Sequence, residues 1–476
     1  MFDVLVIGGG VIGASVLREL SKFKLKTCLL EKESDVCMGA SRANSGVSHA
    51  GFDAKEGSLK AKFNVLGNKM MEGLCKDLGV KYKRNGSLVV AFSDEDLVTL
   101  SELKARGEKN GVEELEIISA EELKKLEPNV SDRAVGALYA KTGGIVCPYE
   151  LTIALTGNAM DNGAELLTDF EVVSAQKTEV GFVVRAKDGR EVQGKVVVNC
   201  AGLYSGKVAE LFGDDTVKIG ARKGEYILLD RESAGFVTRT LFFTPTKLGK
   251  GVLVLPTVDN NILIGPTAEE IDEPQTETTS DGLNFVTEKA KQMCNNIPFY
   301  NTITSFAGVR AYSSTHDFII SESKVCKNLI NVAGIESPGL TSAPAIGEYV
   351  VNGLIAKLLP LVKNEKFNPL RKADYFFKNL SEEEKNALVK QNPAYGRIIC
   401  RCEQITEGEI IRAVTENPKA TTVDGVKRRT RAGMGRCQGG FCQPYVVDII
   451  SEYLKVPYAD VTKSGKGSVL LKGVTK

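Results

Sequence analysis

The stretch Asp3–Leu20, DVLVIGGGVIGASVLREL, decides the fold of the first part of the chain. It begins with a short apolar run, passes through Gly8-x-Gly10-x-x-Gly13 and continues with the apolar spacing of a helix. Gly8 permits a tight turn, Gly10 lets the backbone approach a pyrophosphate, and Gly13 lets the helix pack closely on the strand. The pattern predicts a strand, a turn and a helix whose N-terminus faces phosphate groups.

A second apolar run, KTCLLEK, follows this helix and ends at Glu31 and Lys32. An acid at this position accepts hydrogen bonds from the ribose hydroxyls of a dinucleotide. A glycine triplet alone is weak evidence, because glycine turns join many strands to helices. The strand, helix, second strand and acid together predict dinucleotide binding, and they do not distinguish NAD from FAD.

Length and composition are those of an ordinary multidomain protein. The 476 residues are enough for two or three domains, with 43% hydrophobic and 25% charged residues. The 61 Lys and Arg residues nearly cancel the 60 Asp and Glu residues. Overall charge therefore indicates neither a nucleic-acid partner nor an acidic surface as a binding target.

The sequence also sets expectations about the compartment. The N-terminus has no basic region or cleavage site of a signal peptide, and no uncharged apolar run of about 18 residues occurs. The most apolar segment, residues 345–362, is interrupted by Glu348, Asn352 and Lys357 and predicts an amphipathic helix. We expect a cytoplasmic protein with at most peripheral association, through a partner, at the inner face of the membrane. In a reducing compartment, the eleven cysteines indicate metal or redox chemistry where they are paired.

A loop of small and polar residues, Gly39–Gly51, follows Glu31 and suits the edge of a flavin or a pyrophosphate. The glycine turn, the acid and the pattern GAS…NSG…H-G resemble the D-amino-acid-oxidase-type family of FAD-dependent dehydrogenases. Its glycerol-3-phosphate and L-2-hydroxyglutarate dehydrogenase branches are the most similar, and residues 57–68 and 82–97 resemble the hydroxyglutarate branch in particular. The resemblance implies FAD, with contacts from Ser41, Asn44, Ser45 and Gly46.

Two later stretches fit the same family. An apolar strand, KVVVNCAG, ends at Ala201 and Gly202, where the chain can pass close to a cofactor. Residues 328–355 predict another strand, a loop and a long helix. A helix N-terminus beside the flavin pyrimidine would stabilise the negative charge of reduced flavin. The expected contacts here are Gly334, Gly339, Leu340 and Thr341.

Three segments between these stretches have the character of a second sheet. Residues 221–231, 251–267 and 302–314 are alternating or apolar runs bounded by Gly, Pro and Asn. They predict an antiparallel sheet, interrupted by a helix near residues 280–296 and packed on the nucleotide domain. This sheet should cover the flavin and bind the substrate.

Arg310, in the sequence AGVRAY, is a candidate substrate ligand because its guanidinium can hold a carboxylate or phosphate with two hydrogen bonds. In the resembling family an arginine in this setting binds the anionic end of the substrate. The alternative is an arginine that pairs with a neighbouring loop.

Hydride transfer from an alcohol also requires a base for the hydroxyl proton. The chain has only two histidines, His49 and His316, and both are candidates. His49 has two alternatives: a backbone contact with the flavin, or a covalent link as in some relatives. Glu225 is a further candidate base, with Tyr226 beside it.

The C-terminal part carries Cys400 and Cys402 as C-x-C, and Cys437 and Cys442 as C-x-x-x-x-C. Four thiolates hold either zinc or an iron–sulfur cluster, and a C-x-C pair is unusual for zinc. Together with RRTRAGMGRCQGGFC, the spacing resembles the bacterioferritin-associated-ferredoxin-type [2Fe-2S] domain. The similarity is strongest to the copy at the C-terminus of the anaerobic glycerol-3-phosphate dehydrogenase A-subunit type.

A basic segment accompanies the second cysteine pair, with Lys427 and arginines 428, 429, 431 and 436. Such charge raises the potential of a nearby cluster. It also predicts a docking face for an electron-accepting partner protein, since complementary charge speeds encounter. The segment lacks the interleaved aromatic residues expected of a nucleic-acid site.

These inferences combine into one prediction of fold and organisation. The fold class is α/β: a Rossmann-like FAD-binding domain, an antiparallel-sheet substrate domain and a small helical C-terminal [2Fe-2S] domain. The oxidoreductase body spans residues 1–365, with FAD-binding parts at about 1–80, 145–205 and 305–365 and substrate-domain parts at about 81–144 and 206–304. A linker spans residues 366–395, and the [2Fe-2S] domain spans residues 396–476.

The predicted activity is FAD-dependent oxidation of a small anionic alcohol, with electrons leaving through the cluster to a redox partner subunit. The tail favours glycerol 3-phosphate, giving dihydroxyacetone phosphate. The stretch GIESPGLTSAPAIGE is closer to the hydroxyglutarate branch, so an L-2-hydroxy acid is an alternative. An amino or imino acid substrate, and an electron-transfer subunit without a substrate of its own, are further alternatives.

Overall fold

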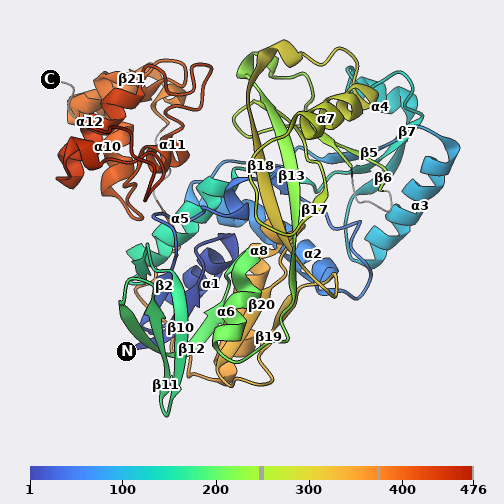
Figure 1. Cartoon of the computed structure of the whole chain (residues 1–476). Coiled ribbons are helices and arrows are strands. Elements are labelled where there is room, and N and C mark those ends of the chain that lie inside the picture. Colours follow the sequence, from blue (N-terminus) through green and yellow to red (C-terminus); the bar gives the residue numbers. More distant parts are fainter. Residues whose placement is uncertain (246–250, 372–375, 474–476) are drawn as a thin grey trace.

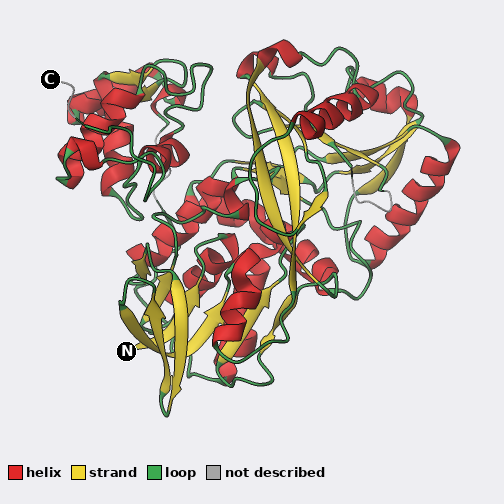
Figure 2. Ribbon diagram, in the orientation of Figure 1, coloured by secondary structure: helices red, strands yellow, loops and turns green. Residues whose placement is uncertain are grey.

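The fold is described from a computed structural model, which describes residues 1–245, 251–371 and 376–473. Figure 1 shows two mixed α/β parts joined by long strands, with a small helical C-terminal module beside helix α5. Figure 2 shows the same arrangement by element type: sheets form the centre of both larger parts, and the module is mainly helical.

The first sheet is built around the glycine turn. Its five parallel strands follow the order β9-β2-β1-β12-β20. They are β1 (Phe2–Ile7), β2 (Thr27–Leu30), β9 (Glu165–Leu167), β12 (Glu191–Asn199) and β20 (Leu329–Ala333). Antiparallel strands complete the eight: β10 (Val172–Thr178), β11 (Gly181–Ala186) and β19 (Ile319–Glu322).

Both faces of this sheet are covered, because successive residues of a strand point to opposite faces. Val4 and Val6 of β1 join a core formed with four helices, whereas Leu5 and Ile7 join a core on the other face. The four helices are α1 (Val11–Ser21), α2 (Leu59–Leu78), α5 (Pro148–Asp161) and α8 (Gly339–Tyr349). The hairpin β10–β11 and helix α6 (Ser205–Leu211) cover the second face.

The second sheet has nine strands in the order β17-β13-β16-β15-β14-β5-β7-β6, and β18 pairs with β13. Its strands are β5 (Ser87–Ala91), β6 (Leu115–Ser119), β7 (Gly136–Ala140), β13 (Ile219–Leu229), β14 (Thr240–Phe243), β15 (Leu253–Pro256), β16 (Ile262–Gly265), β17 (Glu269–Ile271) and β18 (Thr302–Ser313). Helices α3 (Asp94–Lys109), α4 (Ala120–Leu126) and α7 (Ser280–Met293) pack on it.

The predicted antiparallel sheet is confirmed, with one difference. Strand β14 runs parallel to β5, while the other pairings of this sheet are antiparallel. The two parallel strands belong to segments far apart in the chain, and such distant segments can meet in parallel because no short hairpin constrains their direction. A small sheet of β3 (Val47–Ser48), β4 (Tyr82–Lys83) and β8 (Gly144–Val146) lies where the two larger parts meet.

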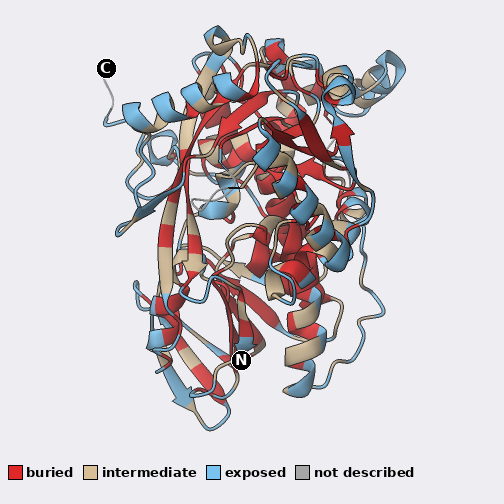
Figure 3. Ribbon diagram, turned by 90° about the vertical axis from the view of Figure 1, so that its right-hand side faces the viewer, coloured by how far each residue is buried: buried red, intermediate tan, exposed pale blue. Residues whose placement is uncertain are grey.

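Burial follows these layers. Figure 3 shows buried residues where helices and strands pack together, and exposed residues along the outer helices. The segment predicted as an amphipathic helix at residues 345–362 begins within α8 and continues as a π-helical turn (Val350–Leu354) and a short 3₁₀ turn (Ile355–Lys357). Among the described residues, no helix has both the length and the apolar character needed to cross a bilayer.

The C-terminal module has its own small core. Helices α10 (Glu407–Thr415), α11 (Val423–Thr430) and α12 (Gln443–Leu454) pack with β21 (Ile398–Cys400) and β22 (Ile405–Thr406). The segment predicted as a linker, residues 366–395, contains a 3₁₀ turn (Phe377–Asn379) and helix α9 (Glu382–Gln391). Residues 372–375 of that segment lie outside the described residues, as do residues 474–476 of the predicted module.

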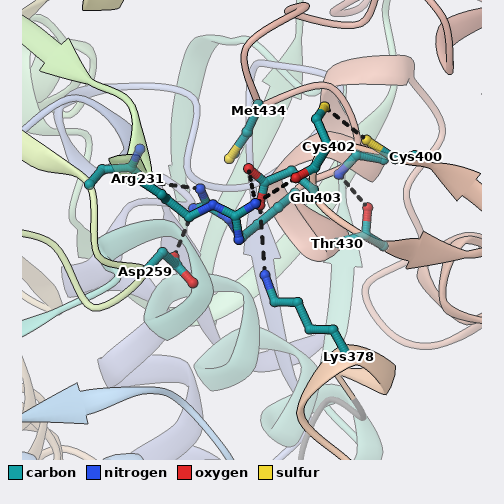
Figure 4. Close-up of polar contacts among 12 residues, drawn as sticks. Arg231, Asp259, Lys378, Cys400, Cys402, Glu403, Thr430 and Met434 are labelled. Carbon is teal, nitrogen blue, oxygen red and sulfur yellow. Dashed lines mark hydrogen bonds and ion pairs between the residues drawn. The ribbon is translucent and has the colours of Figure 1, made fainter. Parts of the chain in front are cut away.

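Buried ion pairs fasten the module to the body, as Figure 4 shows. Arg431, directly after α11, donates to Asp259 at 2.7 Å and to Glu403 at 2.9 Å. Asp259 lies between β15 and β16 and is also paired with Lys81 at 2.6 Å. Arg231, just beyond β13, donates to the Cys402 carbonyl at 2.5 Å. The module is therefore bound to the second sheet mainly through the buried charges of Arg431, Asp259 and Glu403.

These contacts correct one expectation. Arg428, Arg429 and Arg431 do not form an exposed docking face, because their side chains are only 6–7% exposed and pair with acids of this chain. In the sequence they look like a basic surface because their acidic partners, Asp35 and Asp259, are far away along the chain. Arg436 is exposed, and it pairs with Glu232 and Asp230.

Removing Asp259 tests the importance of this interface. Asp259→Ala leaves Arg431 and Lys81 without a shared carboxylate in a buried site, which should lower the free energy of unfolding by ~3–5 kcal/mol. Burial raises the pKa of Asp259, but Arg431 and Lys81 lower it below the usual carboxyl value. The stabilisation is therefore present above the ordinary carboxyl pKa and lost as pH falls through the folded-state pKa.

Urea unfolding at neutral and acidic pH measures this effect. The difference in the free energy of unfolding between the variant and the unmodified chain should be large at pH 7 and smaller in acid. Glu191→Ala is the matched control, because it removes one exposed partner of Arg185 and should change stability by less than ~0.5 kcal/mol. An equal loss of unfolding free energy in both variants would show that the interface ion pair stabilises the protein no more than an exposed one.

Candidate active site

The glycine turn after β1 forms a cradle that larger residues would fill. Gly8 has φ +107°, and a Cβ there would lie 2.4 Å from the Cys200 carbonyl oxygen. A Cβ on Gly13 would lie 2.0 Å from the Gly8 carbonyl oxygen, so α1 can approach β1 only with glycine at this position. Gly10 is the N-cap of α1, and Val11 N donates to Ser41 Oγ at 2.9 Å. This arrangement fits the pyrophosphate of a dinucleotide at a helix N-terminus.

Glu31 lies at the end of β2, beside this turn. Its carboxylate accepts hydrogen bonds from Gly9 N at 2.6 Å and Glu33 N at 2.9 Å. Burial raises the pKa of Glu31 to about 7, although the two backbone N–H groups favour the ionised form. A buried carboxylate with remaining acceptor capacity suits the ribose hydroxyls of the cofactor. Its neighbour Lys32 lies over the ring of Tyr204, 4.0 Å from the ring centre.

A cavity of about 1740 Å³ extends from this turn to the second sheet. It exceeds the ~300–1,000 Å³ of a typical small-ligand pocket, so it has room for both a large cofactor and a substrate. Thirteen of the predicted site residues line it: Gly8, Gly10, Glu31, Lys32, Ser41, Asn44, Ser45, His49, Ala201, Gly202, Arg310, Gly339 and Leu340. Gly13, Gly46, Glu225, His316, Gly334 and Thr341 are not part of its lining.

Several of the predicted residues outside the lining support the cavity wall. Gly46 has φ +67°, and its carbonyl accepts from Val146 N at 2.8 Å. This bond holds the loop Gly39–Gly51 on β8. Gly334 has φ +63° and lies against Ser313. The Thr341 hydroxyl accepts from His49 N at 2.9 Å. Helix α8 is thereby tied to the loop that carries His49.

His49 is half-buried and points to the junction of two cavities. Its Nε2 lies 3.2 Å from Ser337 Oγ, and its ring centre lies 5.9 Å from that of Phe242. Ser337 was not predicted from the sequence. Its position directly before the Pro338–Gly339 start of α8 was the available signal, because that turn faces the cavity.

Arg310, on β18, faces the large cavity together with an arginine that was not predicted. Arg222 on β13 is its direct cross-strand neighbour, and both line the cavity. Arg310 Nη2 donates to the Thr267 carbonyl at 3.0 Å, whereas its buried Nε has no hydrogen-bond partner within the described residues. Arg222 pairs with Glu270 at 3.0 Å and lies 3.9 Å from Glu336. Two guanidinium groups on the wall of one cavity favour an anionic ligand.

Glu225 lies on the opposite face of β13. Its buried carboxylate pairs with Lys223 at 2.9 Å and accepts from Thr279 N at 2.8 Å. Burial raises the pKa of Glu225, but the Thr279 backbone N–H and Lys223 outweigh it and hold the pKa below its usual value. These contacts are those of an ionised residue that caps helix α7. Tyr226, the next residue, does line the cavity and stacks on Phe306 at 4.9 Å.

His316 lies in an exposed turn with φ +57° and stacks on Tyr312 at 5.9 Å. It lines a second cavity of about 640 Å³, which His49, Asp53 and Ser337 also line. The structure thus brings His49 and Arg310 to the large cavity, and His49 and His316 to the smaller one.

The four predicted cysteine ligands converge in the module. Cys402 Sγ lies 3.8 Å from the sulfur atoms of both Cys400 and Cys437, and Cys442 is the N-cap of α12. A Cβ on Gly435 would lie 2.6 Å from Cys402 Sγ, so glycine lets the second loop approach the first.

The loop around Cys437 favours a thiolate. Partial burial raises the pKa of this cysteine, but the backbone N–H groups of Gly439, Phe441 and Gly440 and the Cys402 thiol together lower it. Within residues 1–245, 251–371 and 376–473, no three His, Cys, Asp or Glu side chains surround a single ion position. A binuclear cluster requires only two thiolates on each iron, and the residues present fit this group.

Fold and site together define a flavin-dependent oxidoreductase with a cysteine-rich redox module. The family profile described as FAD dependent oxidoreductase matches residues 3–352, and that of the BFD-like [2Fe-2S] binding domain matches residues 398–452. The chain belongs to the FAD-dependent oxidoreductase family. It is an enzyme, and its cofactors are FAD and a [2Fe-2S] cluster, as the sequence predicted.

Similar proteins match either the whole chain or only part of it. The chain is 51% identical over 478 residues to a glycerol 3-phosphate dehydrogenase from Caloramator mitchellensis, covering 100% of this chain and 99% of the relative. A solved structure of dithionite-reduced L-alpha-glycerophosphate oxidase from Mycoplasma pneumoniae with FAD bound has 34% identity and a TM-score of 0.74, covering 78% of this chain and 98% of the other. Mitochondrial L-2-hydroxyglutarate dehydrogenase from Bos taurus is 34% identical over 283 residues, covering 56% of this chain and 61% of the relative.

Replacing Cys437 separates the two cofactors. Cys437→Ser should remove iron and leave FAD bound, because a serine hydroxyl is not ionised near neutral pH and the flavin cavity contains no residue of the cysteine loops. Iron content and released flavin, measured on the same preparation, check this outcome. Cys326→Ser, outside the module, is the control and should keep both cofactors. Unchanged iron in the Cys437 variant would remove Cys437 from the ligand set.

Proposed function

We propose that the enzyme oxidises glycerol 3-phosphate to dihydroxyacetone phosphate and passes the electrons through its [2Fe-2S] centre to a separate acceptor protein. The observation that carries the proposal is the pair of arginines, Arg222 and Arg310, on the wall of the cavity that His49 also lines. The 51% identity to a protein named glycerol 3-phosphate dehydrogenase, over the whole of this chain, supports the choice of substrate.

In this proposal Arg310 holds the anionic end of the substrate. Its Nη2 is fixed on the Thr267 carbonyl, which orients the planar guanidinium on the cavity wall. Arg222 adds positive charge from the neighbouring strand. A phosphate, with its two negative charges and several acceptor oxygens, satisfies such a pair better than a single hydroxyl does.

His49 accepts the proton of the substrate hydroxyl. Its ring is held from two sides, since Thr341 binds its backbone and Ser337 Oγ lies 3.2 Å from Nε2. The Ser337 contact can select the tautomer of the ring and so leave one nitrogen able to accept a proton. When bound, FAD supplies the hydride acceptor and the cluster supplies a carrier of single electrons.

The other candidate bases have weaker support. Glu225 is turned to the far face of β13 and caps helix α7. His316 is exposed and lines only the smaller cavity, away from Arg310. We therefore assign the proton transfer to His49.

A 2-hydroxy acid is the second candidate substrate. It is favoured by the 34% identity to L-2-hydroxyglutarate dehydrogenase over 56% of this chain. Arg310 can also bind a carboxylate with two hydrogen bonds, so the two substrates differ in their anionic group and not in the oxidised one.

The electron acceptor in this proposal is a partner polypeptide. Cys402 and Cys437 are partly exposed, and Phe441 beside Cys442 is 81% exposed. These residues leave the cluster edge accessible to another protein.

Anaerobic bleaching of the flavin tests the substrate. Glycerol 3-phosphate should bleach the flavin absorbance rapidly, and L-2-hydroxyglutarate should not. Arg310→Lys should raise the glycerol 3-phosphate concentration for half-maximal bleaching by roughly tenfold to a hundredfold, because one charge-assisted bidentate contact contributes ~1.5–3 kcal/mol. Normal FAD content in that variant is the control. If L-2-hydroxyglutarate bleaches the flavin and glycerol 3-phosphate does not, the substrate is the hydroxy acid and the proposal is wrong.

Replacing His49 tests the base. His49→Asn should slow flavin reduction by roughly a hundredfold or more, because general-base catalysis contributes about 10²–10⁴ in rate. Stopped-flow absorbance across pH 5.5–8.5 measures the rate of flavin reduction and its decrease on the acid side. This decrease should be absent in the variant. His316→Asn is the matched control and should keep that acid limb. An acid limb retained without His49 would transfer the role to another group.

A further inference from the structure

The segment after Glu31 contributes to the cofactor cavity at both of its ends. We name residues 31–39 the ribose loop. Glu31, Lys32 and Glu33 line the cavity at its start, and Met38 and Gly39 line it at its end. The middle of the ribose loop, around Asp35, faces away from the cavity and into the C-terminal module.

Two arginines of α11 hold Asp35. Arg428 Nη2 donates to Asp35 Oδ2 at 2.7 Å. Arg429 donates to both carboxylate oxygens, from Nη1 and Nη2, at 2.8 Å each. The side chains of all three residues are 4–7% exposed. This is a bidentate, charge-assisted contact with little solvent screening.

The arginines are themselves fixed in the module. Arg429 also donates to the carbonyls of Pro418 at 2.9 Å and Gly425 at 3.0 Å, so its guanidinium is oriented whether or not Asp35 is present. A second contact lies beside the first, where Ser34 Oγ donates to the Ser464 carbonyl at 3.3 Å. The module therefore holds the ribose loop at two successive residues.

We propose that Arg428 and Arg429 are positioning residues for FAD: by holding Asp35 they fix the ribose loop in the conformation in which Glu31 meets the cofactor. The iron–sulfur module thus completes the flavin site of the same chain. The proposal concerns the cofactor and is independent of which alcohol is oxidised.

The physical argument is preorganisation. The ribose loop has no helix or strand of its own between β2 and the 3₁₀ turn at Ala40–Arg42. Ordering such a segment when the ligand binds costs conformational entropy, which reduces affinity. The ion pair orders the loop beforehand. Loss of the pair should therefore weaken FAD binding without touching any group that contacts FAD.

The experiment compares variants of the full-length protein by the dissociation constant of FAD. Arg429→Gln keeps the Arg428 contact and a similar side-chain size, and it should raise that constant about tenfold, within the 5–150-fold range of ordinary site coupling. Arg429→Lys keeps the charge but not the bidentate geometry. Its dissociation constant for FAD should lie between those of the unmodified chain and Arg429→Gln. Arg436→Gln, an exposed arginine of the same module, is the matched control and should leave FAD affinity unchanged.

Iron content and thermal stability are measured on the same samples. Weaker FAD binding with full iron content supports positioning, because the module is then intact. A lower thermal midpoint with FAD affinity within twofold of the unmodified chain would overturn the proposal and leave the arginines a purely structural role.

A second variant guards against loss of folding. Asp35→Asn should weaken FAD binding at least as much as Arg429→Gln, because it affects the contacts of both arginines. Adding Arg429→Gln to Asp35→Asn should change the affinity little further, because the Asp35–Arg429 ion pair is already lost. Fully additive effects would also contradict the proposal.

Discussion

The relative position of the flavin cavity and the cysteine loops depends on the contacts of one buried guanidinium, that of Arg431. It donates to Asp259, between β15 and β16 of the second sheet, and to Glu403, the residue that follows Cys402. A charge in this position is expensive to bury unless both acids are present, so the module and the body must dock in one orientation. The cysteine loops therefore have a defined position relative to the flavin cavity, which a flexible tether would not provide.

The same helix end explains why the module is more than an attached electron carrier. Arg428, Arg429 and Arg431 are consecutive or nearly so, yet they contact the ribose loop, the β15–β16 turn and Glu403, which follows the first cysteine pair. One short basic run thus joins three regions that are remote in sequence. Arg428 and Arg429 share Asp35, whereas Arg431 is shared by Asp259 and Glu403.

Much of the architecture could be predicted from local patterns, because the glycine turn, the acid at the end of the second strand and the cysteine spacing each constrain the backbone near them. Long-range pairing could not. The arginines of α11 looked like an exposed docking face, because nothing near them in sequence reveals that Asp35 and Asp259 neutralise them. Glu225 and Tyr226 were both considered for the site, although adjacent residues of a strand point to opposite faces and only one of them can face the cavity. Arg222 was missed because its cross-strand partner Arg310 lies 88 positions later.

Strand β13 runs from the cavity to a 3₁₀ turn (Arg231–Ser233) that contacts the cysteine loops. Arg222 and Tyr226 line the cavity from one face of the strand, and Arg231 just beyond its end binds the Cys402 carbonyl. The number of residues in the strand therefore sets the separation between the cavity and the contact with the cysteine loops. Inserting or deleting one residue within β13 would turn the side chains on one side of the change to the other face of the sheet. Relatives that keep Arg222, Arg231 and the cysteine module should differ in the sequence of this strand but not in its number of residues.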